Sequence, residues 1–288
     1  MVSKLENIAK SLSKAVATGG TLLKVLMRSR RPSAPGKPTG RRLALLGNGP
    51  SLRKTLEENP EWLGGSDRLA VNFAANAPAF REIAPRHYVL ADPHFFEGVG
   101  RDPNVGKLWR NLSAADWGMT LHVPCGREKD VERFLGADAG GIDVKTFNLT
   151  PAEGSDAVCH RLYDRGLAMP RPRNVLIPSI MVALREGYRD IYLAGADHSW
   201  LQTLWVDDDN NVVSVQPHFY ADDDKEKERV RSEYRGYHLH DILGSMTVAF
   251  RSYFQIARYA ERIGARIVNA TPGSYIDAFP RLRSLASL

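Results

Sequence analysis

Small, amide and acidic residues recur in this sequence directly after apolar runs, where buried strands are expected to end. The first group, in "LALLGNGPSL", is Gly47, Asn48 and Gly49, followed by Pro50 and Ser51. Glycines at such a turn let backbone N–H groups approach a phosphate, and the next helix N-terminus favours negative charge. Asn48 can hydrogen-bond a ribose, base or phosphate, and Ser51 can cap the helix, with Pro50 in its first turn. The stretch lacks the ending of a P-loop and the third glycine of the dinucleotide fingerprint.

Similar residues follow the later apolar runs, in "LAVNFAAN", "ADPHFF", "LAGADH" and "NATPGS". Each of them alone is also an ordinary turn residue. As a series they favour one shared crevice, because ligands of open α/β sheets bind beyond the carboxyl ends of the strands. The candidate ligand-binding residues at these strand ends are Gly47, Asn48, Gly49, Ser51, Asn72, Asp92, Gly195, Asp197, His198 and Ser274. Asn174 joins these candidates only through the family resemblance given below.

The sequence alternates between strand and helix signals, and the strands and helices that these predict must position the candidate residues. The apolar runs predict strands over 42–48, 69–76, 87–92, 119–125, 190–197 and 266–271, and the helical periodicity predicts helices over 175–188 and 246–265. Alternation of this kind predicts the α/β class, with a mostly parallel, Rossmann-like sheet flanked by helices. The composition, 43% hydrophobic and 25% charged over 288 residues, is that of an ordinary globular chain.

The basic residues are concentrated in an N-terminal arm. Residues 1–42 hold ten Lys/Arg and one acid, a net charge of +9, and the remaining residues carry −3. Apolar residues at helical spacing from Leu5 to Val16, and a second cluster over 22–27, predict a basic amphipathic helix. Residues 1–31 are expected either to lie on an anionic membrane surface or to pack on the body or a partner. Residues 32–40 are a predicted linker, so the arm and linker span 1–40 and the body 41–288.

Three further features limit the function classes. Cys125 and Cys159 are far apart and without spacing partners, so a reducing compartment is expected and no zinc site is indicated. No apolar run is long enough for a transmembrane helix. The charge of −3 on residues 43–288 argues against a nucleic-acid partner. The expected location is the cytoplasm, with a peripheral position on the inner face of the cytoplasmic membrane if the arm binds lipid.

Five motifs in order carry a family resemblance: "LLGNGPSL", "VNF", "ADPHFF", "EGYRDIYLAGAD" and "NATPGS". Over residues 43–275 they resemble the bacterial sialyltransferases of glycosyltransferase family 42 and the domains related to flagellin-modifying Maf glycosyltransferases. The resemblance implies metal-independent transfer from a CMP-activated nonulosonic acid, without further cofactor, to a glycan, lipid-linked or protein acceptor in surface-glycoconjugate synthesis. The family's nucleotide-binding turn falls on Gly47, Asn48 and Gly49, and its strand asparagine on Asn72.

Two departures from the family pattern leave the donor open. Asp92-Pro93 stands where the family has Asn-Pro, and Asn174-Val175-Leu176 replaces its Thr/Ser-Ser-Gly. A carboxylate at Asp92 repels a donor phosphate unless it contacts a sugar hydroxyl. A related branch, the archaeal pterin pyrophosphokinases, makes pyrophosphoryl transfer the alternative reaction. A non-catalytic, membrane-associated binding protein is the third reading.

The family's catalytic base is a histidine in a segment before the last helix, here the lid-like insertion 199–245. The candidates, in order, are His240, His218 and His238, because an imidazole can take a hydroxyl proton near neutral pH. The Asp-rich runs 206–210 and 221–224 resemble cation-binding pairs. We interpret them instead as a hairpin turn and a solvated lid, the latter including the charged segment 222–236, so no metal is expected.

Overall fold

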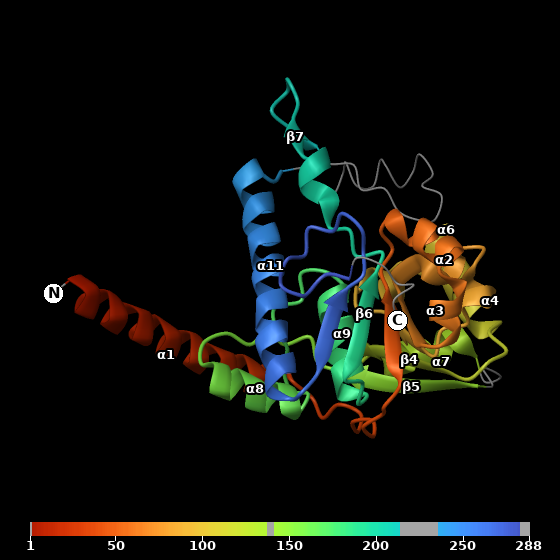
Figure 1. Ribbon diagram of the computed structural model, residues 1–288, viewed down its shortest axis with the longest axis horizontal. Helices are drawn as coiled ribbons and strands as arrows, with labels where there is room; N and C mark the ends of the chain where they lie inside the picture. Colours follow the sequence, from red (N-terminus) through yellow and green to blue (C-terminus); the bar gives the residue numbers. More distant parts are fainter. Residues whose placement is uncertain (1, 137–140, 214–235, 283–288) are drawn as a thin grey trace.

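The computed structural model describes residues 2–136, 141–213 and 236–282, with the side chains of residues 2–5 left aside. Its centre is a seven-stranded sheet in the order β5-β4-β3-β2-β1-β6-β9, and every pairing is parallel (Figure 1). The predicted α/β class with a parallel sheet is therefore confirmed. The sheet strands are β1 (Arg42–Leu46), β2 (Asp67–Val71), β3 (His87–Val89), β4 (Met119–Pro124), β5 (Ile142–Phe147), β6 (Asp190–Ala194) and β9 (Arg266–Asn269).

Helices cover both faces of the sheet. One face packs on α8 (Asp156–Asp164), α9 (Leu176–Arg185) and α11 (Leu239–Arg262). The other face packs on α2 (Ser51–Glu58), α3 (Pro60–Gly64), α4 (Phe80–Ile83), α5 (His94–Glu97), α6 (Pro103–Ser113) and α7 (Glu128–Leu135). Helix α9 is buried along nearly its whole length, from Leu176 to Leu184, as expected for a helix that is apolar all round. It packs against the middle of the sheet, next to the crevice described below.

The chain order reverses beside β1. From β1 the chain adds β2, β3, β4 and β5 on one side, and then returns to place β6 and β9 on the other. Strands β1 and β6 are paired from Arg42↔Asp190 to Leu46↔Ala194. In a doubly wound sheet this reversal opens a crevice at the carboxyl ends of the strands, which is where such folds bind ligands.

Three element boundaries differ from the sequence predictions. Strand β2 ends at Val71, and the predicted strand residues 72–76 form the 3₁₀ helix η1 (Asn72–Asn76). Asn72 turns the chain there with φ of 51°, a left-handed conformation that asparagine tolerates better than most residues. Strand β5 was not predicted, because its residues are mostly exposed or half-buried and form no apolar run. Helix α11 begins at Leu239, seven residues before the predicted start, so 239–245 are helical and not part of an insertion.

The N-terminal arm is a single continuous helix, α1 (Val2–Arg28), which extends away from the body in its first half (Figure 1). The predicted linker 32–40 contains no helix or strand. It is nevertheless attached to the body, because the backbone N–H groups of Ser33, Gly36 and Thr39 donate to the carbonyls of Thr146, Arg185 and Gly187. Cys125 and Cys159 are both free. Among the described helices, none combines the length and apolar character needed to span a bilayer.

A chain of four polar side chains is buried at the amino ends of β2 and β3. The Tyr188 hydroxyl donates to Asp67 Oδ2 at 2.7 Å and lies 3.0 Å from His87 Nε2. His87 Nδ1 lies 3.1 Å from His122 Nε2. Since the hydroxyl proton goes to the carboxylate, His87 Nε2–H donates to Tyr188 and His122 Nε2–H donates to His87. Burial lowers the pKa of His87 to about 4 and that of His122 well below its usual value, so both rings are neutral.

These two histidines predict a loss of stability in mild acid. Unfolded imidazoles take up protons as the pH falls through about 6.5, whereas folded His87 does not until the pH nears 4, and burial holds the pKa of folded His122 well below its usual value too. The unfolded state therefore binds more protons, and the free energy of unfolding falls with pH in this window. At pH 5 the expected loss from His87 is about 2 kcal/mol, at 1.36 kcal/mol per pH unit below 6.5, and His122 adds a loss of the same sign. Urea unfolding at pH 7.5 and 5.0 measures it, and equal free energies at the two pH values contradict it.

Candidate nucleotide-sugar site

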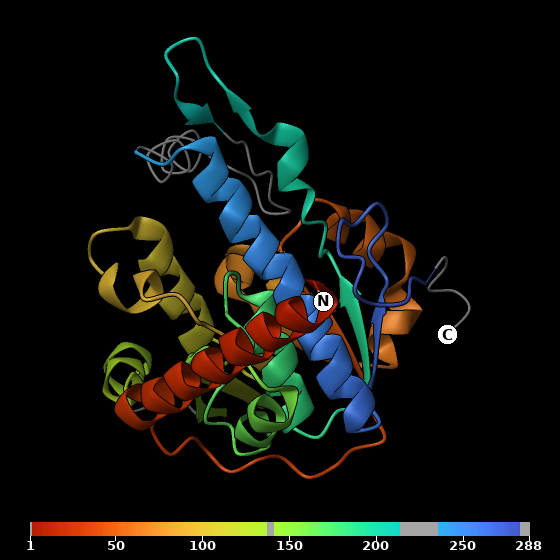
Figure 2. The ribbon, with the colours of Figure 1, turned by 90° about the vertical axis from the view of Figure 1, so that its left-hand side faces the viewer.

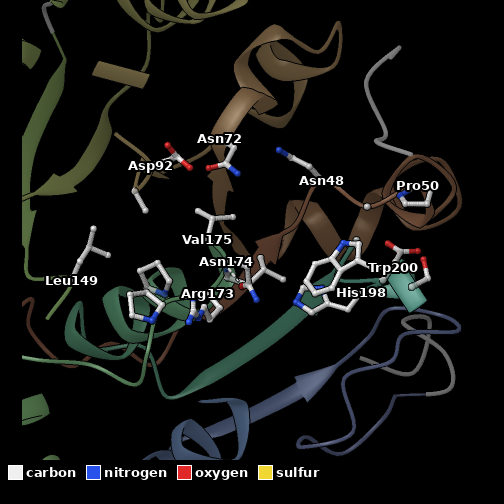
Figure 3. Close-up of a pocket in the computed structure, with 18 of the residues that line it drawn as sticks. Asn48, Pro50, Asn72, Asp92, Leu149, Arg173, Asn174, Val175, His198 and Trp200 are labelled. Atoms are coloured by element: carbon white, nitrogen blue, oxygen red, sulfur yellow. Dashed lines mark hydrogen bonds between the residues drawn. The ribbon is translucent and has the colours of Figure 1, made fainter. Parts of the chain in front are cut away.

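A cavity of about 410 Å³ opens at the reversal point of the sheet, beyond the carboxyl ends of β1, β2, β3 and β6. The loops after β1, β2 and β3 line one side, and the start of α9 together with the loop after β6 lines the other (Figure 3). Figure 3 shows Asn48, Asn72 and Asp92 along one wall, with Arg173, Asn174, His198 and Trp200 across from them. The lining residues are Asn48, Gly49, Pro50, Asn72, Ala91, Asp92, Pro93, Leu149, Pro172, Arg173, Asn174, Val175, Leu176, Pro178, Gly195, Asp197, His198, Ser199 and Trp200.

The loops after β1 and β6 approach too closely for side chains. A Cβ on Gly47 would lie 2.4 Å from the carbonyl oxygen of Gly195, and a Cβ on Gly195 would lie 2.6 Å from that of Gly47. Gly195 also has a positive φ of 64°, which favours glycine. The amide of Gly47 donates to Ala194 O and that of Gly49 to Gly195 O. Both amides are thus used within the protein, and in this loop the side chain of Asn48 faces the cavity.

Asp197 joins the same two loops through Ser51. The Ser51 hydroxyl donates to Asp197 Oδ2 at 2.9 Å and the Ser51 amide to Oδ1 at 3.3 Å. The predicted role of Ser51 as a side-chain cap is therefore wrong, because its hydroxyl is drawn to this carboxylate and makes no capping bond. Pro50 is the N-cap residue and not part of the first turn. Burial raises the pKa of Asp197, and the two hydrogen bonds from Ser51 partly oppose that shift.

Two asparagines of the cavity wall carry buried oxygens without hydrogen-bond partners. Asn48 Nδ2 donates to the Val71 carbonyl at 3.1 Å, which turns Asn48 Oδ1 away from that strand. Asn48 Oδ1 and Asn72 Oδ1 are both buried atoms with no hydrogen-bond partner. A buried amide oxygen without a partner costs about 1–3 kcal/mol. Two such atoms in one cavity indicate a ligand that donates hydrogen bonds to them.

Asn174 presents the opposite polarity. Its Oδ1 accepts from the Leu176 amide at 3.0 Å and the Ile177 amide at 3.4 Å, and both are fixed donors at the start of α9. This fixes the amide so that Nδ2, which is buried and has no partner, remains as a donor. Asn174 Nδ2 therefore offers hydrogens to an acceptor on a ligand.

The Asn174 amide is held from behind by Tyr253 and His198. The Tyr253 hydroxyl donates to Asn174 Oδ1 at 3.0 Å and lies 2.6 Å from His198 Nε2. Its single proton goes to Asn174, so His198 donates from Nε2–H. Burial lowers the pKa of His198 to about 3, and the ring is therefore neutral near pH 7 and a poor general base. His198 acts here as a fixed, neutral member of the cavity wall.

Arg173 and Trp200 complete the cavity, and the sequence predictions had missed both. Arg173 is exposed, and its guanidinium makes no hydrogen bond or ion pair with the described residues. The Trp200 ring stacks on His198, with ring centroids 4.2 Å apart. Both residues also line a second cavity of about 220 Å³, together with Asn174, Ile242, Ser245, Met246 and Ala249. The signals available were the "PRPRN" stretch before α9 and the tryptophan two residues after His198.

Most of the predicted donor-binding residues meet in this cavity. Asn48, Gly49, Asn72, Asp92, Asn174, Gly195, Asp197 and His198 all line it. Gly47, Ser51 and Ser274 lie behind the lining: Gly47 and Ser51 join loops, and the Ser274 hydroxyl donates to the Ala196 carbonyl at 2.6 Å. Asp92 Oδ1 accepts from the His94 amide at 2.8 Å.

The candidate bases lie at the far end of α11. His238 is its N-cap, in a capping box with Asp241, and His240 is in its first turn with an 81% exposed side chain. Neither histidine lines the cavity. The predicted lid-like insertion 199–245 is helical from Leu239 onward, because this capping box starts α11 there. His218 lies outside the described residues.

The first Asp-rich run forms the predicted hairpin. Strands β7 (Trp205–Val206) and β8 (Val212–Val213) are antiparallel, and η2 (Ser199–Thr203) precedes them. Asp207 Oδ1 accepts from the amides of Asp209 and Asn211, so its carboxylate is engaged in turn formation. The second run, 221–224, and most of the charged segment 222–236 lie outside the described residues. Within the described ranges there is no group of three or more His, Cys, Asp or Glu that could hold a metal ion.

Comparison with known proteins finds a likeness of fold among solved structures. No family model matches the sequence, and no curated protein matches it. Among solved structures, the chain superposes on the MAf glycosyltransferase from Magnetospirillum magneticum AMB-1 with a TM-score of 0.50 and 14% sequence identity. The likeness is one of fold. It covers 92% of this chain and 38% of the other, so this chain spans little more than a third of that protein.

The Tyr253 network predicts a stability effect. Tyr253→Phe removes the hydroxyl that bonds Asn174 Oδ1 and His198 Nε2, leaving a buried imidazole N–H without a partner. The expected loss is about 1–3 kcal/mol in the free energy of unfolding, measured by urea denaturation. Tyr259→Phe is the matched control, because that hydroxyl bonds the half-exposed Asp164 and water can replace it. Equal losses in the two variants contradict the network.

Proposed function

We propose that this protein is a glycosyltransferase that binds a nucleotide-sugar donor in the 410 Å³ cavity. The observation that carries the proposal is the set of three buried amide atoms without partners: Asn48 Oδ1, Asn72 Oδ1 and Asn174 Nδ2. They lie at the reversal point of a doubly wound sheet, where such folds bind nucleotides. The fold shared with a MAf glycosyltransferase supports the same reaction class.

The polarity of these atoms suits a nucleotide. The two amide oxygens can accept from an exocyclic amino group or ribose hydroxyls, and the Asn174 amide can donate to a carbonyl or phosphate oxygen. Cytosine has one such amino group beside ring-edge acceptors, which is consistent with a CMP-activated nonulosonic acid as donor. Trp200 offers an aromatic face and Arg173 a guanidinium for a phosphate or carboxylate. For Asp92, we propose a contact with a sugar hydroxyl.

The second cavity is the proposed acceptor side. It shares Arg173, Asn174 and Trp200 with the first, so a donor and an acceptor can meet across these residues. The proposed acceptor is a glycan, carried on a lipid or protein or free. Residues 1–31 are the proposed contact with an anionic membrane surface.

The proposed chemistry is inverting transfer. The acceptor hydroxyl oxygen bonds to the anomeric carbon as the bond from that carbon to the donor phosphate breaks. The hydroxyl proton passes to a base, and the released phosphate oxygen keeps the bonding electrons, with Arg173 offsetting its charge. His240, then His218, then His238 are the proposed bases. The α11 end that carries His238 and His240 borders the second cavity through Ile242.

Calorimetry with CMP, CDP, UDP and GDP tests the donor site. We expect one of them to bind. We expect Asn174→Asp to weaken that binding by on the order of 10–100-fold, because a hydrogen bond to a charged group, worth about 1.5–3 kcal/mol, is lost. The substitution keeps Oδ1 for the α9 amides and Tyr253, and it replaces only the donor at Nδ2.

Asn59→Asp is the control for added negative charge, because Asn59 bonds the Thr55 carbonyl outside the cavity. No binding of any of the four nucleotides overturns the proposal. ATP binding that requires Mg²⁺, with activity lost in EDTA, assigns the cavity to pyrophosphoryl transfer instead.

The base is tested by turnover. His240→Ala is expected to lower kcat by on the order of 10²–10⁴-fold with little change in donor KM, since a general base acts in the transition state. The readout is nucleotide released per enzyme in the presence of acceptor. His160→Ala serves as the control, because His160 packs against Tyr163 and Tyr259, away from the cavity. Unchanged turnover in His240→Ala moves the role to His218 or His238.

A further inference from the structure

Helix α1 rests on the body through its polar face. The Thr21 side chain is fully buried, and its hydroxyl donates to Glu153 O at 2.8 Å and accepts from Glu153 N at 2.9 Å. One turn earlier, Thr18 Oγ1 accepts from the Ser155 amide at 2.9 Å. Amphipathic helices of globular proteins ordinarily do the reverse and turn their apolar stripe to the core.

The opposite face of α1 is an uncovered apolar stripe, defined here by Ile8, Leu12, Val16, Leu23 and Leu26. Their exposed fractions run from 57% to 82%. At about 100° per residue they fall within an arc of about 80° whose centre lies about 180° from Thr21. The stripe therefore runs along the helix on the side away from the body, and its first half lies on the part of α1 that extends beyond the body (Figures 1 and 2).

A row of exposed apolar side chains in a chain with an ordinary core indicates a surface that something covers. The charge of the arm discriminates between the two simplest occupants. Residues 2–28 of α1 hold five Lys/Arg and one acid, a net charge of +4, so two copies of α1 packed stripe to stripe bring like charges together. An anionic lipid surface instead attracts the same charges, at about 1 kcal/mol for each Lys or Arg near the surface.

We propose that α1 lies in the interface of an anionic lipid membrane, with its apolar stripe inserted among the acyl chains. A helix with an apolar face, a basic polar face and low mean hydropathy binds in this way. The proposal deepens the membrane contact proposed above for residues 1–31 by naming the inserted face of the helix, and it does not rest on sugar transfer, since the stripe faces away from the body.

The attachment of α1 to the body gives this docking a geometric consequence. Ser29 Oγ donates to Leu167 O, and the Arg30 backbone exchanges two hydrogen bonds with the Asn148 side chain. The next residue, Leu149, lines the main cavity. A docked α1 therefore holds the cavity wall at a defined position relative to the lipid surface, because Ser29 and Arg30, the two residues directly after the helix, bond Thr150 and Asn148.

Vesicle flotation with the full chain tests the proposal. Vesicles of phosphatidylcholine with about 30% phosphatidylglycerol are compared with pure phosphatidylcholine vesicles. We expect binding to the anionic vesicles that weakens as NaCl screens the charges. The double variant Leu12→Gln/Val16→Gln is expected to lower the partition coefficient by on the order of tenfold or more, because it removes apolar surface from the stripe. Both side chains are exposed, so the fold does not depend on them.

Ser11→Gln/Ser13→Gln is the matched control, at exposed positions of the same turns but outside the stripe. Circular dichroism and the nucleotide titration show that each variant is folded. Equal partitioning of the stripe variant and the control overturns the proposal. So does a dimer, seen by sedimentation without lipid, that dissociates in Leu12→Gln/Val16→Gln, since the occupant is then a second copy of the chain. Because flotation measures no sugar transfer, failure here leaves the transferase proposal untouched.

Discussion

The contact between the loops after β1 and β6 is the constraint on which the site depends. Gly47 and Gly195 face each other so closely that neither position has room for a Cβ. The two strands are neighbours in the sheet, and their loops diverge only after this contact. As a result, Asn48 leaves one strand and His198 leaves the other within reach of a single cavity. Larger residues at the glycine positions would push the loops apart and separate the groups that must act together.

Backbone groups set the polarity of this cavity. The Val71 carbonyl orients the Asn48 amide, and the first amides of α9 orient that of Asn174. A side-chain amide is ambiguous by itself, because its two ends are nearly the same shape. Here, fixed main-chain donors and acceptors decide which end faces the ligand. The pattern of acceptors and donors that a ligand meets is thus a direct product of where β2 ends and where α9 begins.

The strands that flank the site and the polar residues directly after them could be predicted from the sequence, whereas the chain path after β2, strand β5 and two further cavity residues could not. Strands β1 and β6 are continuous apolar runs, and their ends located Asn48 and Asp197. Residues 72–76 have a strand-like sequence pattern, but the strand ends before them because Asn72 turns the chain with a positive φ. Hydrophobic periodicity does not reveal a single left-handed residue. Strand β5 was missed because it is only partly buried. Arg173 and Trp200 meet only through folding, and no local pattern marks such a pair.

The joint between α1 and the body is made almost wholly of hydrogen bonds from Thr18, Thr21 and Ser29, with Val25 as the partly buried apolar contact. Water can satisfy each of these polar groups when the helix is absent. The body therefore has little apolar surface at this joint to conceal, in contrast to an ordinary helix–core interface. A joint of this kind makes the arm exchangeable: sequence change can lengthen, replace or delete it without repacking the core that holds the cavity.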